Sequence, residues 1–284
     1  MTGSTLEAYL RSFSAAGGSQ QVAIAGTIQR LANAALKLQV ALAEGAVDLR
    51  PRPCQDARNP SGDAQHALDL HADELFTEAA RDAGVAHFAS EERPNAMVLN
   101  AGGTLGLALD PLDGSSNIET NLSIGTIFSI LPALDTPEAT FGQKGRAQLA
   151  AGFFIYGPQL SLALTLGQGT HIFTFSRRLG TFIEANAGIV VPARGKVFAI
   201  NMSNYRHWDE AVRLFVDDCL KGSDGVLEQD FNMRWNAAMV AEAFRILRQG
   251  GIYLYPRDER RGYHNGRLRL VYEANPIALL MEQA

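Results

Sequence analysis

Two aspartates at the end of an apolar run are the residues best suited to chemistry. The run Leu105–Leu109 leads directly to Asp110 and, three residues later, to Asp113. Carboxylates that follow a strand can converge on hard divalent cations, which prefer oxygen ligands. The next residues can present backbone N–H groups at a helix start, where anions bind readily: Gly114, Ser115 and Ser116. Cation ligands beside an anion cradle suit phosphate chemistry. The alternative, an ordinary Asp-Pro turn with a serine cap, does not account for the whole string DPLDGSSNI.

Four glutamates could join these aspartates: Glu74, Glu91, Glu92 and Glu273. The adjacent pair follows the predicted strand Val85–Ala89, and Glu273 follows the predicted strand Leu268–Tyr272. Glu74 lies on a predicted helix and alone would be an ordinary surface charge. Carboxylates gathered in one pocket repel one another unless a cation is present, so their clustering favours a metal site.

These strings resemble a known family. DPLDGSSNI, the preceding SEE at 90–92 and the later LRLVYEANP at 268–276 are similar to class 1 fructose-1,6-bisphosphatase, a member of the metal-dependent, lithium-sensitive sugar phosphatases. The similarity runs from about residue 20 to the end of the chain. It implies an α/β fold of alternating helix and sheet layers (αβαβα). It also implies Mg²⁺-dependent hydrolysis of fructose 1,6-bisphosphate to fructose 6-phosphate and phosphate, in gluconeogenesis or the Calvin cycle.

The resemblance implies metal ligands and a water-activating acid. About two or three Mg²⁺ ions per subunit are expected, with Mn²⁺ or Zn²⁺ as substitutes. Their ligands would be five carboxylates and one backbone carbonyl: Glu91, Glu92, Asp110, Asp113, Glu273 and the carbonyl of Leu112. Glu74 matches an acid that, with Glu92, orients or deprotonates the attacking water. The 1-phosphate would lie in the turn that contains Asp113, Gly114, Ser115 and Ser116.

A second set of residues matches the part of the family site that holds the sugar and its 6-phosphate: Asn201, Met239, Tyr255, Arg267 and Arg269. Arg267 stands where the family usually has lysine, and a planar guanidinium binds phosphate with a different geometry from a point-like ammonium. Arg234 matches an arginine that reaches the 6-phosphate of a neighbouring subunit. The resemblance therefore implies a homotetramer.

Other functions remain open from the sequence. Sedoheptulose 1,7-bisphosphate could be a substrate, alone or together with the fructose ester, because the distal pocket does not reveal sugar length. An inositol or nucleotide phosphatase is disfavoured by Arg234 and Tyr255, which suit a second phosphate. A non-catalytic sugar-phosphate sensor would be expected to lack one of the acids.

One departure concerns regulation. Many family members bind AMP through a T-G-E-x-T-like turn and a Lys-Tyr pair, and the corresponding positions here are Val22–Thr27 and Thr104-Leu105. The groups that would hold a nucleotide phosphate are missing, so we expect weak or absent inhibition by AMP.

Composition limits the remaining classes. The 284 residues are 46% hydrophobic and 19% charged, which is typical of a globular chain. A net charge of −5 argues against nucleic acid or an anionic membrane surface as a partner. Cys54 and Cys219 are too few for a disulfide framework, and neither a signal peptide nor an apolar run of about 20 residues is visible. A cytoplasmic location is expected.

The elements that must position the acids follow from periodicity. Apolar residues from Ile24 to Leu42 recur every three or four positions and predict a helix, and a second is expected at about 69–83. Strand-length apolar runs then follow: 85–89, 105–109, 124–131, 149–156, 160–166, 171–175, 181–184 and 197–200. Two helices (208–220 and 235–249), two strands (252–255 and 268–272) and a helix start at Asn275-Pro276 complete the pattern. The segment 207–211 resembles the W-D-x-A element of inositol monophosphatases, but a helix N-terminus is the simpler interpretation.

These elements suggest two parts. Residues 1–190 would form a metal- and 1-phosphate-binding domain, and residues 191–284 a sugar- and 6-phosphate-binding domain. The proline-rich segment Arg50–Asp63 is predicted to be a loop. The chain reaches Ala284 inside a predicted helix without a glycine cap, so we expect the C-terminal domain to be truncated.

Overall fold

The computed structural model describes residues 3–44 and 67–284 and is built around an eight-stranded sheet. The strand order is β2-β1-β3-β4-β5-β6-β7-β8, and every neighbouring pair is antiparallel except β1 and β3. The strands are β1 His87–Ser90, β2 Met97–Val98, β3 Leu105–Asp113, β4 Ile124–Pro132, β5 Ala150–Tyr156, β6 Leu160–Thr165, β7 Thr170–Ser176 and β8 Thr181–Asn186. The central strands are buried on both faces, which explains why their sequences are continuous apolar runs rather than alternating ones.

Helices cover both faces of this sheet, and β5 shows how the sequence divides its residues between them. On one face lie α1 (Leu6–Ala15), α2 (Ser19–Glu44) and α3 (Ala67–Asp82). On the other lie α6 (Met239–Gln249) and α7 (Asn275–Glu282). Successive strand residues point to opposite faces. Phe154 therefore packs in the core with α1–α3, whereas its neighbour Phe153 packs with α6 and α7.

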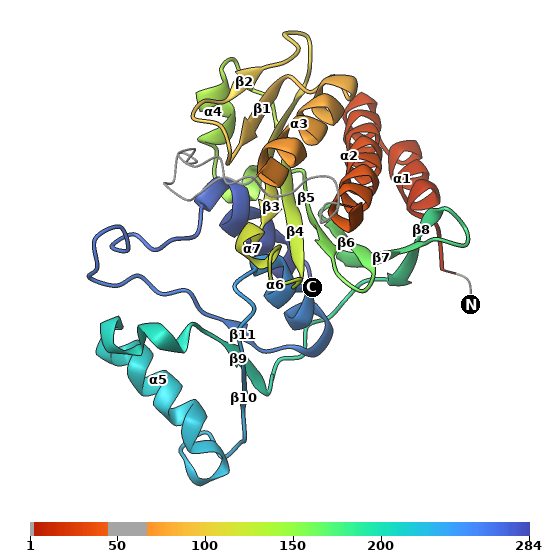
Figure 1. Ribbon diagram of the computed structural model, residues 1–284. Helices are drawn as coiled ribbons and strands as arrows, with labels where there is room; N and C mark the ends of the chain where they lie inside the picture. The colour runs from red at the N-terminus through yellow and green to blue at the C-terminus, as the bar shows by residue number, and fades with distance from the viewer. Residues whose placement is uncertain (1–2, 45–66) are drawn as a thin grey trace.

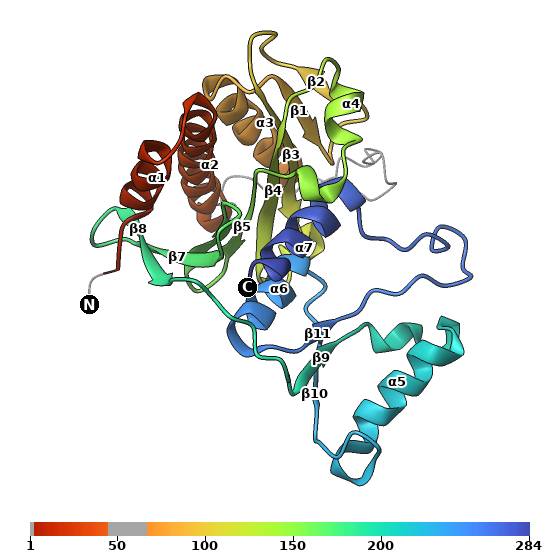
Figure 2. The same cartoon turned by 180° about the vertical axis from the view of Figure 1, so that it is seen from behind.

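A smaller unit extends from the other side of α6 and α7 (Figures 1 and 2). Its three parallel strands have the order β10-β9-β11, with β9 Val197–Ala199, β10 Asn232–Arg234 and β11 Ile252–Tyr253. Helix α5 (Glu210–Lys221) packs on this sheet through Val216 and Cys219, which meet Phe198 and Trp208. Helices, large sheet, helices, small sheet and helix thus alternate, and the predicted layered α/β fold is confirmed.

The predicted elements agree with the structure in most places. The helix predicted from Ile24 to Leu42 is α2, and its apolar stripe, from Ile24 to Leu38, is buried. At the W-D-x-A-like segment, Asp209 caps α5 by accepting a hydrogen bond from the Val212 N–H at 3.0 Å, as expected for a helix N-terminus. The sequence patterns did not predict α1, β2, α4 (Pro137–Phe141) or β10.

Two predictions near the C-terminal part are wrong. The segment expected to be a strand, 268–272, instead enters a turn of π-helix at Leu270–Ala274. Asn275 is therefore an interior residue of a continuing helix rather than its N-cap. The predicted loop Arg50–Asp63, including Cys54, lies outside the described residues. Within the described segments, no helix is both long enough and apolar enough to cross a membrane.

Candidate active site

A bulge in β3 brings Asp110 and Asp113 to the same side of the sheet. Asp110 pairs with Ile127 of β4, and Asp113 pairs with Gly125, so three steps on β3 match two on β4. Residues three apart in a regular strand point to opposite faces, and one extra residue reverses that relationship. The Thr126 hydroxyl donates to the Pro111 carbonyl at 2.9 Å and fixes the bulge. The local backbone thus makes the two carboxylates neighbours.

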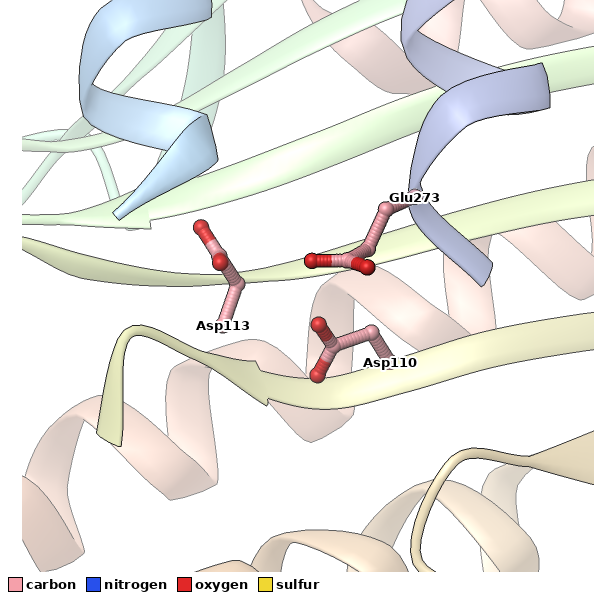
Figure 3. Close-up of side chains that lie close together, drawn as sticks. All are labelled: Asp110, Asp113 and Glu273. Carbon is pink, nitrogen blue, oxygen red and sulfur yellow. The ribbon is translucent and has the colours of Figure 1, made fainter. Parts of the chain in front are cut away.

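Glu273 completes a buried group of three carboxylates with these aspartates (Figure 3). One oxygen from each of the three side chains lies within 4.8 Å of the others. Glu273 is held by the π-helical turn, where its carboxylate accepts a hydrogen bond from the Arg269 backbone N–H. Oxygen donors at this spacing from rigid elements fit a hard divalent cation.

The same three groups show why a cation belongs there. Burial raises the pKa of Glu273 to about 8, and the neighbouring Asp113 adds to the increase. Burial also raises the pKa of Asp113 to about 6, against the lowering effect of hydrogen bonds from the backbone at Val240 and Met239. The pKa of Asp110 is well above its usual range because of burial and the negative charges around it. A divalent ion would remove this repulsion and allow all three to ionise.

Further charged residues surround a cavity of about 360 Å³ next to the three carboxylates. Glu91 and Glu92, just beyond the end of β1, line it together with Asp69 of α3. Arg269 is the counter-charge, with Nη2 2.7 Å from Glu91 Oε1 and Nη1 3.8 Å from Glu273 Oε1. The guanidinium therefore bridges acids from two distant parts of the chain.

An anion cradle opens on the same cavity. Gly114 has φ +78° and precedes the short 3₁₀ turn η1 (Ser115–Asn117), both of whose serines line the cavity. A Cβ at Gly114 would lie 2.5 Å from the Ala238 Cβ, so glycine is required there for space as well as conformation. Asn117 anchors the turn by donating to the Asn236 carbonyl at 2.7 Å. The backbone N–H groups at this turn thus have a fixed position beside the carboxylates.

Aromatic and basic groups form the far end of the cavity. Tyr253, Tyr255 and Arg267 line it. Trp235 stacks on Tyr253 with ring centroids 5.8 Å apart and nearly parallel planes, and it meets Tyr255 edge-on at 5.9 Å. One end of the cavity therefore suits metal and phosphate, and the other suits a polar molecule with a second anionic group.

Comparison with known proteins identifies the family. The family model "Fructose-1-6-bisphosphatase, N-terminal domain" matches residues 48–187, and "Fructose-1-6-bisphosphatase, C-terminal domain" matches residues 191–284. The chain belongs to the fructose-1,6-bisphosphatase family. It is 54% identical over 288 residues to the class 1 fructose-1,6-bisphosphatase of Rhizobium meliloti (strain 1021), covering all of this chain and 82% of the relative. A class 1 fructose-1,6-bisphosphatase of Nitrobacter hamburgensis is 50% identical over 264 residues, covering 89% of this chain and 76% of the relative.

Solved structures of fructose-1,6-bisphosphatases share the fold. The Leishmania major enzyme in holo form superposes with a TM-score of 0.90 at 26% identity, over 100% of this chain and 87% of that one. Its T-state structure gives a TM-score of 0.85 at 25% identity, with the same coverage. The family resemblance stated from the sequence motifs is therefore confirmed across the whole chain.

The structure gathers most of the predicted site residues of this family member around one cavity. Those that line it are Glu91, Glu92, Asp110, Leu112, Asp113, Gly114, Ser115, Ser116, Met239, Tyr255, Arg267, Arg269 and Glu273. Asn201 and Arg234 do not line it. The Asn201 side chain accepts hydrogen bonds from the N–H and the hydroxyl of Ser203, and Arg234 is exposed on β10.

The prediction that Glu74 orients or deprotonates the attacking water must be corrected. Glu74 is exposed on α3 and lies outside the cavity, whereas Asp69 is buried and lines it. The two are five positions apart, and at about 100° per residue they lie about 140° apart around the helix, so only one can face the site. The burial of Ala72, Asp73 and Phe76 marks the inner face of α3. In the sequence, the helical spacing of Asp69 with Ala72, Asp73 and Phe76 was the signal that could have identified Asp69 as the acid on the inner face. Tyr253 and Trp235 were also missed.

Proposed function

We propose that this fructose-1,6-bisphosphatase family member hydrolyses the 1-phosphate ester of fructose 1,6-bisphosphate in the cavity described above, with Mg²⁺ as its metal. The observation that carries the proposal is the buried group Asp110, Asp113 and Glu273 beside the anion cradle that begins at Gly114. Both halves of a metal-assisted phosphatase site are thus within one cavity. Relatives that are 54% identical to this chain are named class 1 fructose-1,6-bisphosphatase, which supports the choice of substrate.

The metal would be held by carboxylates and one carbonyl around the cavity: Glu91, Glu92, Asp110, Asp113, Glu273 and the carbonyl of Leu112. When bound, Mg²⁺ supplies charge neutralisation of the phosphate and lowers the pKa of water. The donor set consists of hard oxygens, which suits Mg²⁺ first and Mn²⁺ as a substitute, with Zn²⁺ possible at carboxylate-rich positions. The number of acids is sufficient for about two or three ions.

The remaining groups have separate tasks. Asp69 and Glu92 would hold the attacking water and accept its proton, a role that passes from Glu74 to Asp69 because only Asp69 lines the cavity. The N–H groups at Ser115 and Ser116 would hold the 1-phosphate oxygens in fixed positions as charge develops. Met239 at the start of α6 would contact the sugar.

Tyr255 and Arg267 would bind the 6-phosphate at the far end of the cavity. Asn201, on the segment after β9, does not line the cavity, and its contact with the 6-phosphate stays a prediction from the family resemblance. Arg234 is exposed on β10, which suits contact with the 6-phosphate of a neighbouring subunit. We therefore assign a homotetramer in which subunits complete one another's distal pockets. We also propose a catalytic role for residues 1–190, a substrate-binding role for residues 191–284, and a cytoplasmic place in gluconeogenesis or the Calvin cycle.

The decisive experiment is phosphate release from fructose 1,6-bisphosphate by metal-depleted protein, with and without added Mg²⁺. Mg²⁺-dependent release that leaves fructose 6-phosphate as the product is expected. Absence of release from protein with a native circular dichroism spectrum and bound Mg²⁺ would overturn the proposal. A parallel series with sedoheptulose 1,7-bisphosphate measures kcat/KM on the longer sugar and separates a single-substrate from a dual-specificity enzyme.

A further inference from the structure

The turn that carries Glu91 and Glu92 is tied to α3 by an ion pair. Arg93, the next residue of the turn, has its Nη2 2.5 Å from Oδ2 of Asp73 on α3. Asp73 is buried and Arg93 is only partly exposed, and neither lines the catalytic cavity. The pair therefore joins two segments that both supply acids to that cavity, helix α3 and the turn after β1, which lie side by side in Figures 1 and 2.

The Arg93 guanidinium is held by more than one group. Its Nη2 also donates to the Thr77 hydroxyl at 3.4 Å, and its Nη1 donates to Met97 Sδ at 3.7 Å. Asp73 and Thr77 are four positions apart on α3, so successive turns of one helix face bind the same side chain. A planar fork held at several atoms has a fixed direction, which a point-like ammonium would lack. The Arg93 side chain therefore sets where the turn lies relative to α3.

Hydrogen bonds within the turn carry this constraint to the two glutamates. The Arg93 N–H donates to the Ser90 carbonyl at 3.1 Å, and the Glu92 N–H donates to the Ser90 hydroxyl at 3.3 Å. The Glu91 N–H donates to the Leu109 carbonyl of β3, also at 3.1 Å. The turn is thus short and closed, so a displacement of Arg93 would move Glu92 with it.

Asp69 lies one helical turn before Asp73 on the same inner face of α3. Four residues correspond to about 6 Å along the helix axis. Asp69 and Glu92 both line the catalytic cavity, whereas the pair of Asp73 and Arg93 lies just behind it. The ion pair therefore links the supports of the two acids.

The arrangement of this ion pair suits positioning better than stability. Asp73 Oδ1 and Arg93 Nε are buried and have no hydrogen-bond partner among residues 3–44 and 67–284. A buried ion pair seldom stabilises a fold more than apolar side chains of similar volume would, and a buried polar atom without a partner adds a cost. A fixed separation between α3 and the turn accounts for the pair more directly.

We propose that Asp73 and Arg93 are positioning residues for hydrolysis. Their ion pair holds Glu92 at a fixed distance from Asp69, the acid with which it would orient the attacking water. This inference rests on the proposed function of the catalytic cavity. Because a misplacement of about 1 Å can lower a rate about a hundredfold, a tie one helical turn from the reacting water is sufficient to control kcat.

The kinetic test compares variants of the pair on fructose 1,6-bisphosphate. Arg93→Gln and Asp73→Asn should each lower kcat by about tenfold or more, with KM within about twofold, because the groups that would bind the substrate come from other segments. Arg93→Lys keeps a cation that can pair with Asp73 and should restore kcat to within about threefold of the wild type. The double variant Asp73→Asn/Arg93→Gln should lose no more than the more impaired single variant, because both substitutions break one interaction.

Arg30→Gln is the matched control. Arg30 of α2 also pairs with an aspartate of α3, with Nη1 3.7 Å from Asp82 Oδ2, but at an exposed position far along the helix from Asp69. Its loss should leave both kcat and KM unchanged.

Two measurements on metal-depleted protein need no turnover. Hydrogen exchange of the peptide 90–98 should be about fivefold faster in Arg93→Gln than in the wild type, and unchanged in Arg30→Gln. Mg²⁺ binding by calorimetry should be about threefold weaker in Arg93→Gln, because Glu91 and Glu92, the proposed ligands, are held less firmly.

A kcat within twofold of the wild type in both folded single variants overturns the proposal, as do losses that multiply in the double variant. Unchanged hydrogen exchange together with unchanged Mg²⁺ affinity also overturns it. If Arg93→Gln does not fold, as judged by its unfolding midpoint, Asp73→Asn keeps the size of the side chain and carries the same tests. If the wild type releases no phosphate, the proposed function fails, whereas the exchange and Mg²⁺ measurements still decide whether the pair positions the acids.

Discussion

Substitution of Glu273 by glutamine separates two effects of the buried acids on stability. One is the pH dependence of stability in the metal-depleted protein, and the other is the stabilisation by bound Mg²⁺. The pKa of Glu273 is about 8 in the folded chain, compared with an ordinary value of 4.5. An acid with a raised pKa binds more protons in the folded state, so its contribution to the free energy of unfolding decreases as pH rises. That decrease covers the window from about pH 4.5, where the unfolded chain ionises, to about pH 8, where the folded chain does.

The slope in that window is about 1.4 kcal/mol per pH unit from this group. Between pH 5 and pH 7 the metal-depleted wild-type protein should therefore lose about 3 kcal/mol of stability that Glu273→Gln keeps. The amide oxygen of glutamine can still accept the hydrogen bond that the Arg269 N–H now donates to Glu273. The substitution also lessens the repulsion that raises the pKa of Asp110.

Added Mg²⁺ should reverse the order of stability of the wild type and Glu273→Gln. The wild-type protein should gain stability that increases from pH 5 to pH 8, as protons leave the carboxylates, whereas Glu273→Gln should gain little because one ligand is gone. Urea unfolding, followed by tryptophan fluorescence at several pH values with and without Mg²⁺, measures both effects. Glu282→Gln, at an exposed position of α7, is the matched control. Parallel pH curves for wild type and Glu273→Gln, together with equal stabilisation by Mg²⁺, would refute the assignment.

Four further outcomes are expected. Asp113→Ala should abolish Mg²⁺-dependent phosphate release while the circular dichroism spectrum stays native, with a stability loss of about 1–3 kcal/mol because the Val240 N–H loses its acceptor; near-normal turnover would contradict the metal assignment. Asp69→Asn should lower kcat by about a hundredfold or more, whereas Glu74→Gln should leave it within twofold; the opposite order would restore Glu74. Micromolar AMP should leave the steady-state rate unchanged, and strong inhibition would show that a nucleotide site exists. Gly125→Ala should destabilise the chain by about 2 kcal/mol or more in urea unfolding, because its Cβ would lie 2.3 Å from the Phe154 carbonyl oxygen; unchanged stability would contradict the tight packing of β4 on β5.

The large sheet could be predicted from sequence because its strands are short apolar runs between turn residues. The predicted run 124–131 differs from β4 by one residue, and 160–166 differs from β6 by one. The bulge between Asp110 and Asp113 could not be predicted in the same way. It depends on the pairing of β3 with β4 and on the Thr126 hydroxyl, and both are long-range contacts.

The error at α3 has a different cause. The sequence predicted the helix correctly but not which side of it faces the sheet. The family resemblance assigned the water-activating acid to Glu74 without testing which face of the helix it occupies. Asp69 and Asp73 are both buried, and acidic residues are seldom buried, so polarity alone does not place an acid on the inner face. A functional carboxylate on an inner helix face breaks the usual polarity rule. Such violations are expected at active sites.

The C-terminal part of the site shows most clearly why local pattern was insufficient. The run 268–272 is short and mostly apolar, as in a strand, yet the Glu273 side chain accepts from the Arg269 N–H and closes a π-helical turn instead. In an extended strand Glu273 could not turn back to this N–H, whereas the turn directs its carboxylate toward Asp110 and Asp113. The same turn places the Arg269 guanidinium 2.7 Å from Glu91, almost 180 positions earlier in the chain. This local turn therefore brings Glu273 and Arg269 to the acids that the distant strands β1 and β3 position.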